Sequence, residues 1–197
     1  MDRAEFEAQA VGHLDAVYRI AFHLTRNSEQ AEDLVQDVYV RALKPAAVER
    51  FEDRSAEGTG GVRAYLFAIA HNVFYSKIKR EARAPTAVGE FFAEASNETP
   101  PDEAPPAWDL ASLDWEQVDG TLRKAIEDLK PEYREVLLLW GVEGLKYREI
   151  ASIIEAPIGT VMSRLHRARK LLAEALEADE GWRDRVGVRA ADENEDG

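Results

Sequence analysis

Cysteine is absent from this chain of 197 residues. Disulfide bridges, thiol redox switches and cysteine-ligated zinc sites are therefore excluded. No apolar run approaches the ~20 residues that a membrane-spanning helix needs. The N-terminal residues also lack the basic and then apolar pattern of a secretory signal. Together these absences predict a cytoplasmic protein.

Motifs that carry enzyme chemistry are missing as well. The chain has four histidines, none of them in an H-E-x-x-H or similar paired-ligand pattern. Each histidine is better interpreted as structural or solvated (His13, His23, His71 and His166). Asp33 and Asp37 share a helix face, but they fit a docking surface better than a catalytic pair. We therefore expect no enzymatic activity, no bound metal and no cofactor.

The chain lacks an overall positive charge, since its net charge is −13. That sum argues against a nucleic-acid partner, but the distribution of charge matters more. Residues 90–120 hold nine acidic residues and no Lys or Arg, whereas residues 63–83 hold five basic residues and one acid. Residues 146–170 hold six basic residues and two acids. Two basic segments separated by an acidic one predict two DNA-contacting surfaces on separate bodies.

Apolar residues recur at helical spacing through the first 84 residues. They predict helices over 4–26, 29–43 and about 62–83. Asn27-Ser28 is the expected N-cap of the second helix, because a side chain of either type can accept the free N–H groups there. Pro45 is expected to stop that helix, since proline cannot continue it. The glycine-rich stretch 51–61 is expected to be a loop.

Helical spacing stops after residue 84 and returns at about residue 112. Residues 85–111 are rich in proline and acid, which predicts a flexible linker. Pro131 suits the first position of a further helix, and Gly141 and Gly144 suit its end. The sequence thus predicts an all-α fold of two small helical domains. Their expected bounds are 1–84 and 112–178, with an acidic tail over 179–197.

The most informative stretch is 146–170, where two short helical patterns meet at a turn, Glu155-Ala156-Pro157. In the second pattern, one face is apolar and suits packing on the first helix (Val161, Leu165, Ala168 and Leu172). A different face carries hydroxyl and guanidinium groups and no acid (Thr160, Ser163, Arg164 and Arg167). This arrangement predicts a helix-turn-helix whose second helix enters a major groove. The alternative is an ordinary helical hairpin with a solvated basic face.

The predicted helix over 62–83 interleaves aromatic and basic residues on one side (Tyr65, Phe67, His71, Phe74, Tyr75, Lys77, Lys79 and Arg80). Rings that stack on bases beside cations that meet phosphates are what a single-stranded nucleic-acid surface needs. The alternative is that most of these rings belong to the hydrophobic core and the basic residues to a solvated helix end. The segment alone does not decide between the two.

The order of these parts resembles the extracytoplasmic-function sigma factors of the sigma-70 family. Residues 21–44 (A-F-H-L-T-R-N-S-E-Q-A-E-D-L-V-Q-D-V-Y-V-R-A-L-K) and 62–73 (V-R-A-Y-L-F-A-I-A-H-N-V) are similar to region two. Residues 129–151 and 157–170 resemble region four. The similarity covers about 150 residues in the family's order. It implies a region-two helical bundle and a region-four helix-turn-helix domain.

The resemblance also implies a function, namely a dissociable promoter-specificity subunit of RNA polymerase serving a stress or envelope-type regulon. It implies docking on the clamp helices of the β′ subunit through one helix (Asp33, Leu34, Gln36, Asp37 and Tyr39). The minus-ten element would be opened and held by the loop over 51–61 and the helix after it (Tyr65, His71, Asn72, Tyr75, Lys77, Lys79 and Arg80). The minus-thirty-five element would be read by the second helix of the helix-turn-helix (Thr160, Ser163, Arg164, Arg167 and Lys170). Its domain would grip the flap of the β subunit, and an anti-sigma factor is expected as a further partner.

The chain departs from the family pattern at four positions. Tyr65 stands where Trp is common, and Ser76 stands where Asp is common. Lys146 replaces the usual Ser or Thr cap before the helix-turn-helix, and Glu155 replaces the glycine of its turn. Glu155 is strained if its φ angle is positive. The remaining alternative function is a one-component regulator that binds an operator without polymerase.

Overall fold

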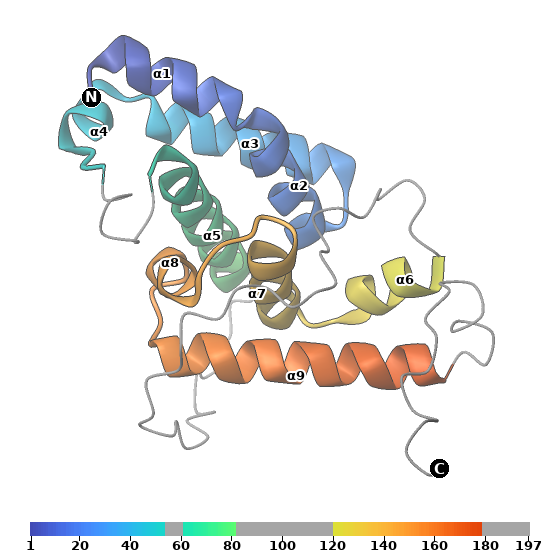
Figure 1. Ribbon diagram of the computed structural model, residues 1–197. Coiled ribbons are helices and arrows are strands. Elements are labelled where there is room, and N and C mark those ends of the chain that lie inside the picture. The colour runs from blue at the N-terminus through green and yellow to red at the C-terminus, as the bar shows by residue number, and fades with distance from the viewer. Residues whose placement is uncertain (54–60, 82–119, 179–197) are drawn as a thin grey trace.

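The computed structural model of the chain describes residues 1–53, 61–81 and 120–178. Within those ranges the chain forms helices and no strand, which confirms the all-α fold class. The helices form an N-terminal bundle (α1–α5) and a C-terminal bundle (α6–α9), which pack against each other (Figure 1). The predicted linker over 85–111 and tail over 179–197 lie outside the described residues. None of the helices in the described part has the length and apolar content of a membrane span.

The N-terminal bundle contains two more helices than the sequence predicts. Its elements are α1 (Arg3–Gly12), α2 (Leu14–Thr25), α3 (Ser28–Ala42), α4 (Pro45–Arg50) and α5 (Val62–Glu81). The expected single helix over 4–26 is divided at His13, whose backbone has φ −102° and ψ 10°. Gly12 directly before the break is a poor helix former, so the chain turns there at low cost.

The ends of these helices follow their capping residues. The Asp2 side chain accepts the N–H of Glu5 at 2.8 Å, and the Asn27 side chain accepts the N–H of Gln30 at 2.9 Å. The predicted cap over Asn27-Ser28 is thereby confirmed, with Asn27 as the capping residue and Ser28 as the first residue of α3. Pro45 does follow the end of α3, but it also occupies the first position of α4. A proline whose fixed φ suits that position was a signal for α4 that the sequence prediction missed.

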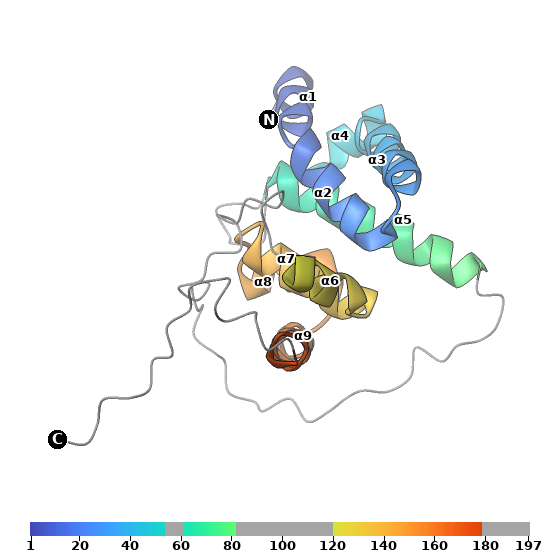
Figure 2. The same cartoon turned by 90° about the vertical axis from the view of Figure 1, so that its right-hand side faces the viewer.

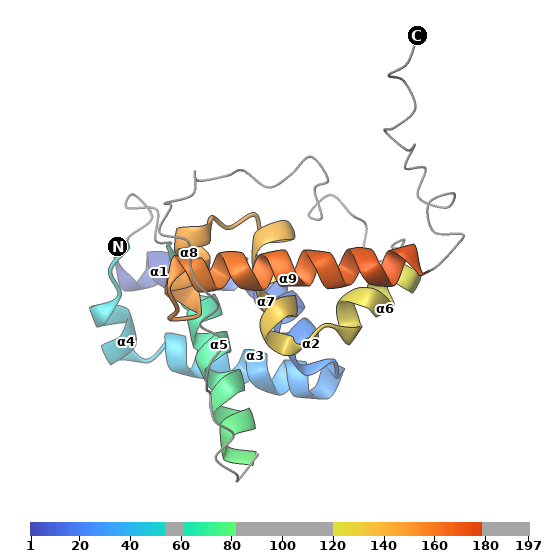
Figure 3. The same cartoon turned by 90° about the horizontal axis from the view of Figure 1, so that it is seen from below.

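The longest helix of the N-terminal bundle, α5, packs against α1, α2 and α3. Apolar spacing along this helix predicts that Val62, Leu66, Ile69 and Val73 face inward; Ile69 is partly buried and the other three are buried. Phe67 and Phe74, which the sequence placed on the opposite, mixed side, are buried too, at 1% and 9% exposure. The core interpretation is therefore correct for these two rings. The C-terminal end of α5 projects beyond the other helices (Figure 3).

The C-terminal bundle contains α6 (Gly120–Asp128), α7 (Pro131–Gly141), α8 (Tyr147–Ile153) and α9 (Ile158–Glu177). Pro131 occupies the first position of α7, as predicted. α7 packs against α9 on one side and against α2 of the N-terminal bundle on the other. Figure 2 shows α7 between the N-terminal bundle and α9. This position explains why eight consecutive residues of α7, including two charged ones, are buried.

α8 and α9 form the predicted helix-turn-helix. Val161, Leu165, Ala168 and Leu172 of α9 are all at most 2% exposed, which confirms the expected apolar face. Lys146 contributes no side-chain cap to α8; instead its N–H donates to the Glu149 carboxylate at 2.9 Å. That bond satisfies one of the backbone groups that begin the helix.

The turn between α8 and α9 places Glu155 in the left-handed region, with φ 51°. For a residue with a Cβ this conformation costs ~1–2 kcal/mol. We expect the free energy of unfolding of the Glu155→Gly variant to be about 1 kcal/mol higher than that of the Glu155→Ala variant. Both variants lack the carboxylate, so the difference isolates the backbone. Chemical denaturation followed by circular dichroism measures it, and equal stabilities would contradict strain at this residue.

Candidate nucleic-acid interface

The exposed face of α9 carries the residues that the sequence selects as base and phosphate contacts. Ser163 and Arg167 are exposed, while Thr160 and Arg164 are partly exposed. The Ser163 hydroxyl donates to the Thr160 carbonyl at 3.1 Å, which holds it against its own helix. The side chains of Arg164 and Arg167 can therefore extend farther from the helix than that of Ser163. Guanidinium groups on an exposed helix face can bind a guanine edge or phosphates.

Lys170 extends the same face by one turn but differs in its surroundings. Its ammonium group lies 3.9 Å from the Glu174 carboxylate, and both side chains are more than half exposed. An exposed pair of this kind is weak, so the lysine can exchange the carboxylate for a phosphate at little cost. Lys170 therefore suits a backbone contact better than a base contact.

Three of the residues predicted to hold the minus-ten element are engaged by the C-terminal bundle. The Nδ1 atom of His71 lies 2.9 Å and 3.1 Å from the two carboxylate oxygens of Glu135 in α7. The Asn72 side-chain amide donates to the Glu155 carboxylate at 2.9 Å. The Tyr75 ring lies 4.5 Å from the His71 ring, and burial, followed by the charge of Glu135, raises the pKa of Tyr75.

The other predicted minus-ten residues on α5 lie apart from these three. Lys77, Lys79 and Arg80 are exposed in its last turns, where no acid of the described chain pairs with them. Tyr65 lies at the opposite end of α5 and is partly buried, which raises its pKa. The seven residues thus do not form one continuous surface in this arrangement.

Tyr65 forms the wall of a hollow of about 380 Å³ between α4 and the start of α5. Its ring lies 5.2 Å from that of Phe51, and the cations of Lys44 and Arg50 also line the hollow. Rings beside cations suit an unstacked base and its phosphate. The sequence prediction missed Lys44 and Arg50, because α4 was not foreseen, and it included Phe51 only as the first residue of the loop over 51–61.

The face of α3 predicted to dock on a protein partner is divided between surface and interior. Asp33, Gln36 and Asp37 are exposed, whereas Leu34 is 6% exposed and belongs to the core. The Tyr39 hydroxyl donates to the Ala10 carbonyl at 2.7 Å, which ties α3 to α1. Leu34 and Tyr39 therefore hold α3 in place but do not belong to its exposed surface.

Val40 completes the same face and was not predicted. It is 57% exposed and lies three and four residues beyond the exposed Asp37 and Gln36, on the same side of α3. An apolar side chain beside acids and an amide fits a protein surface better than DNA. We name Asp33, Gln36, Asp37 and Val40 the α3 face.

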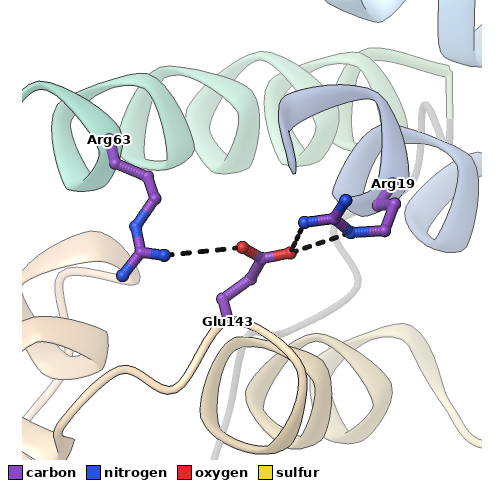
Figure 4. A network of polar contacts seen from close by, with 3 residues as sticks. All are labelled: Arg19, Arg63 and Glu143. Carbon is purple, nitrogen blue, oxygen red and sulfur yellow. Dashed lines mark hydrogen bonds and ion pairs between the residues drawn. The ribbon is translucent and has the colours of Figure 1, made fainter. Parts of the chain in front are cut away.

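The two bundles are joined by a buried carboxylate. Glu143, in the loop after α7, accepts hydrogen bonds from Arg19 Nε at 3.2 Å and Arg19 Nη2 at 2.8 Å. Its second oxygen lies 3.8 Å from Arg63 Nη1, and its side chain is 2% exposed (Figure 4). The predicted picture of two separate DNA-contacting bodies therefore changes. In this structure the middle of α5, at His71 and Asn72, contacts the other bundle, whereas its basic last turns remain exposed.

Comparisons with known proteins now assign the fold. Residues 11–84 match the family model described as Sigma-70 region 2, and residues 119–172 match Sigma-70, region 4. The ECF RNA polymerase sigma factor EcfG of Rhodopseudomonas palustris (strain TIE-1) is 31% identical over 159 residues. That match covers 81% of this chain and 78% of the relative. This chain belongs to the ECF RNA polymerase sigma factors.

A second ECF sigma factor, SigE of Mycolicibacterium smegmatis, is 30% identical over 164 residues. The match covers 83% of this chain, and the chain spans 58% of the length of that relative. The resemblance carried by the sequence motifs is confirmed by these matches. Region 2 falls on the N-terminal bundle, and region 4 falls on the C-terminal bundle with its helix-turn-helix.

Among solved structures, the ECF sigma factor fold is similar to that of the sigma factor RpoE from Bartonella quintana, crystallised with the anti-sigma factor NepR. The two chains are 30% identical, with a TM-score of 0.62. The match covers 89% of this chain and 99% of the other.

Within the described residues, His, Asp and Glu side chains do not gather into a group that could hold a metal ion.

Proposed function

We propose that this sigma factor binds core RNA polymerase and directs it to promoters, without catalytic activity of its own and in the cytoplasm. The observation that carries the proposal is the presence of both sigma-70 regions in their family order, each with its own exposed face. Each bundle has its own proposed role. Residues 1–84 bind the polymerase and the minus-ten element. Residues 112–178 serve the minus-thirty-five element and the β flap.

The α3 face is the proposed contact with the β′ clamp helices. Asp33 and Asp37 supply negative charge, and the half-exposed Val40 supplies apolar area that binding would remove from water. Because Leu34 and Tyr39 fix α3 against the core, the face is presented on a rigid helix. Rigid presentation lowers the entropy lost on binding.

Promoter DNA is the proposed ligand of α5 and α9. The hollow at Tyr65 and Phe51 suits an extruded base of the minus-ten element, and Lys77, Lys79 and Arg80 suit the phosphates beside it. The exposed face of α9 suits the major groove of the minus-thirty-five element. Since the chain carries a net charge of −13, the polymerase must supply most of the affinity for DNA.

An anti-sigma factor is a further proposed partner. The structural relative RpoE was crystallised with one, and its chain matches both bundles of this protein. The absence of cysteine means that a redox signal would be sensed by that partner and not by this chain. Affinity purification from cells followed by mass spectrometry tests this proposal together with binding to core polymerase.

Reconstitution with core polymerase tests the main function. Incubated with sheared genomic DNA from its source, the holoenzyme should give discrete run-off transcripts that core polymerase alone does not give. Two promoter elements aligned upstream of those starts would support both DNA assignments. If the holoenzyme gives no such transcript while the free protein shifts duplex DNA, the one-component regulator is the correct function instead.

Arg164→Ala is expected to reduce transcription from a promoter found in this way by about tenfold or more, since a good bidentate base contact contributes ~1–3 kcal/mol. The loss should disappear on a template whose minus-thirty-five element has been scrambled. Lys124→Ala, which removes an exposed cation from α6, is the control and should leave both templates unaffected. An equal loss on both templates would contradict a role for Arg164 in reading that element.

A further inference from the structure

The exposed face of α9 carries a row of positive charge, which we name the α9 cations (Arg164, Arg167 and Lys170). No acid of the described chain pairs with Arg164 or Arg167. Lys170 lies 3.9 Å from Glu174, in the weak exposed pair already described. A row of cations that lacks strong partners attracts a polyanion. Promoter DNA is one such polyanion under the proposed function, and any other that reaches the row can bind it too.

The tail over 179–197 contains a polyanion within the chain itself. Residues 179–190 are balanced, because three acids stand beside three arginines (Asp179, Glu180, Asp184, Arg183, Arg185 and Arg189). Residues 192–196, by contrast, hold four acids and no base, and we name them the acid cluster (Asp192, Glu193, Glu195 and Asp196). Runs of like charge often serve as interaction segments. The acid cluster is opposite in sign to the α9 cations and similar to them in number.

The acid cluster is tethered within reach of these cations. The chain leaves α9 at Ala178, and α9 is one continuous helix (Figure 1). At about 1.5 Å of rise per residue, Arg164 lies about 21 Å back along the helix from Ala178. An extended chain spans up to about 3.3 Å per residue, so Asp192 can lie as far as about 46 Å from Ala178. The chain is therefore long enough for the cluster to fold back over the whole row.

We propose that the acid cluster docks on the α9 cations and competes there with promoter DNA. The proposal rests on the proposed function, since it takes this face of α9 as the reader of the minus-thirty-five element. A carboxylate offers a guanidinium the same paired acceptor oxygens as a phosphate. Tethering gives the cluster a local concentration in the millimolar range, so ion pairs that are weak one by one are sufficient. DNA and the cluster then bind the same cations, and each excludes the other.

The first measurement locates the acid cluster in the full chain. Because cysteine is absent, a spin label on Asn194→Cys attaches nowhere else, and the substitution removes no charge. At low salt the label should broaden the amide NMR signals of residues 160–170 and leave those of α1 unchanged. The broadening should disappear at about 1 M salt, where charges are screened over about 3 Å. A mixture of spin-labelled chain with isotope-labelled, spin-free chain should show none, and broadening there would mean that the cluster binds a second copy instead.

Two matched double substitutions separate docking from net charge. Asp192→Asn with Glu193→Gln, the distal pair, removes two charges from the acid cluster. Asp179→Asn with Glu180→Gln, the proximal pair, removes the same two residue types beside the end of α9. Neither pair touches a described helix, since all four positions follow α9. Glu180 can lie at most about 7 Å from Ala178, too near to cover the row. The distal pair should lose the broadening of α9, and the proximal pair should keep it.

The second measurement is the affinity of the free, unlabelled protein for a random-sequence DNA duplex of about 20 base pairs at fixed low salt, by fluorescence anisotropy. The distal pair should bind about threefold more tightly than wild type, because the apparent dissociation constant falls as the uncovered fraction of α9 rises. The proximal pair should show a smaller change. In a chain that also carries Arg164→Gln and Arg167→Gln, the distal pair should give no gain, since the cations under competition are gone.

Absence of broadening in α9, or broadening at Lys77, Lys79 and Arg80 in its place, would overturn docking on this face. Broadening of α9 without a gain in affinity from the distal pair would overturn competition with DNA. An equal gain from both pairs would assign the effect to net charge and would also overturn it. Run-off transcription by the wild-type holoenzyme tests the proposed function separately. Its success leaves that function standing whatever the cluster does, and its failure removes promoter DNA as the competitor even if the cluster docks.

Discussion

The Trp140→Ala variant is expected to lose about 3–5 kcal/mol of its free energy of unfolding, the range for removal of a buried large aromatic side chain. Trp140 is 2% exposed on α7, the helix enclosed between α2 and α9. The guanidinium carbon of Arg169 on α9 lies 5.7 Å from the centre of a Trp140 ring, which adds a cation–π contact. Because α7 and α9 would lose their shared packing, the helix-turn-helix should be the part most affected.

Trp140→Phe is the matched control for this prediction. The indole Nε1 atom is buried and has no hydrogen-bond partner, so the native side chain already carries an unsatisfied donor. Phenylalanine removes that donor while keeping most of the ring, and we expect a loss within about 1.5 kcal/mol. Denaturant unfolding followed by circular dichroism measures both variants. If Trp140→Phe is as unstable as Trp140→Ala, the donor has a partner and the packing argument is wrong.

Arg134→Leu is expected to lower the free energy of unfolding by about 3 kcal/mol or more, because hydrogen bonds from a charged donor contribute ~1.5–3 kcal/mol each. The buried Arg134 guanidinium donates to the carbonyls of Glu127 and Leu129 at 2.7 Å and 3.1 Å. It also reaches the Leu24 carbonyl at 3.5 Å, at the end of α2 in the other bundle. Leucine fills part of the space but leaves these carbonyls without a donor.

Arg134→Lys should recover only part of the loss, since an ammonium group cannot reproduce the planar fork of a guanidinium. Lys124→Leu, on the exposed side of α6, should change stability by no more than about 0.5 kcal/mol. Thermal and denaturant unfolding of the three variants give the comparison. Full stability in Arg134→Lys would show that charge alone, and not the fork, is what the site requires.

The Arg134→Leu substitution should also change how the stability of the protein depends on pH. Burial, and after it the charge of Arg134, lower the pKa of His23 from 6.5 to about 4. The stability that neutral His23 contributes is therefore complete above pH 6.5 and is lost as the pH falls through about 4. Removing Arg134 removes one cause of the lowered pKa, so the pKa should rise and the loss should become smaller. An NMR titration of the His23 ring measures the shift directly.

The sequence predicted the parts of the fold that depend on local chemistry. The apolar stripe from Val161 to Leu172 specified the inner face of α9, because apolar residues at helical spacing mark the buried side whichever helices cover it, here α6, α7 and α8. Asn27 and Pro131 marked helix starts through a cap and a fixed φ, which are properties of single residues. Strain at Glu155 was expected on the condition that its φ is positive, and the φ angle of 51° meets that condition.

The contact between the bundles was out of reach of the sequence. Arg19 and Glu143 are 124 residues apart, and nothing in the spacing of either one marks the other as its partner. The aromatic and basic side of α5 was ambiguous for the same reason. Phe67 and Phe74 turn toward the core, and the occupant of the space beside His71 comes from a separate bundle. Periodicity locates a helix face but not what covers it.

Glu155 has a consequence for how the sequence of this sigma factor can change over time. The residue sits in a strained conformation that glycine would relieve, yet its carboxylate accepts the Asn72 amide. A mutation to glycine would therefore relieve the backbone strain of the turn and would also remove the hydrogen bond to Asn72. A single substitution at this position thus cannot improve the turn and keep this link between the two bundles.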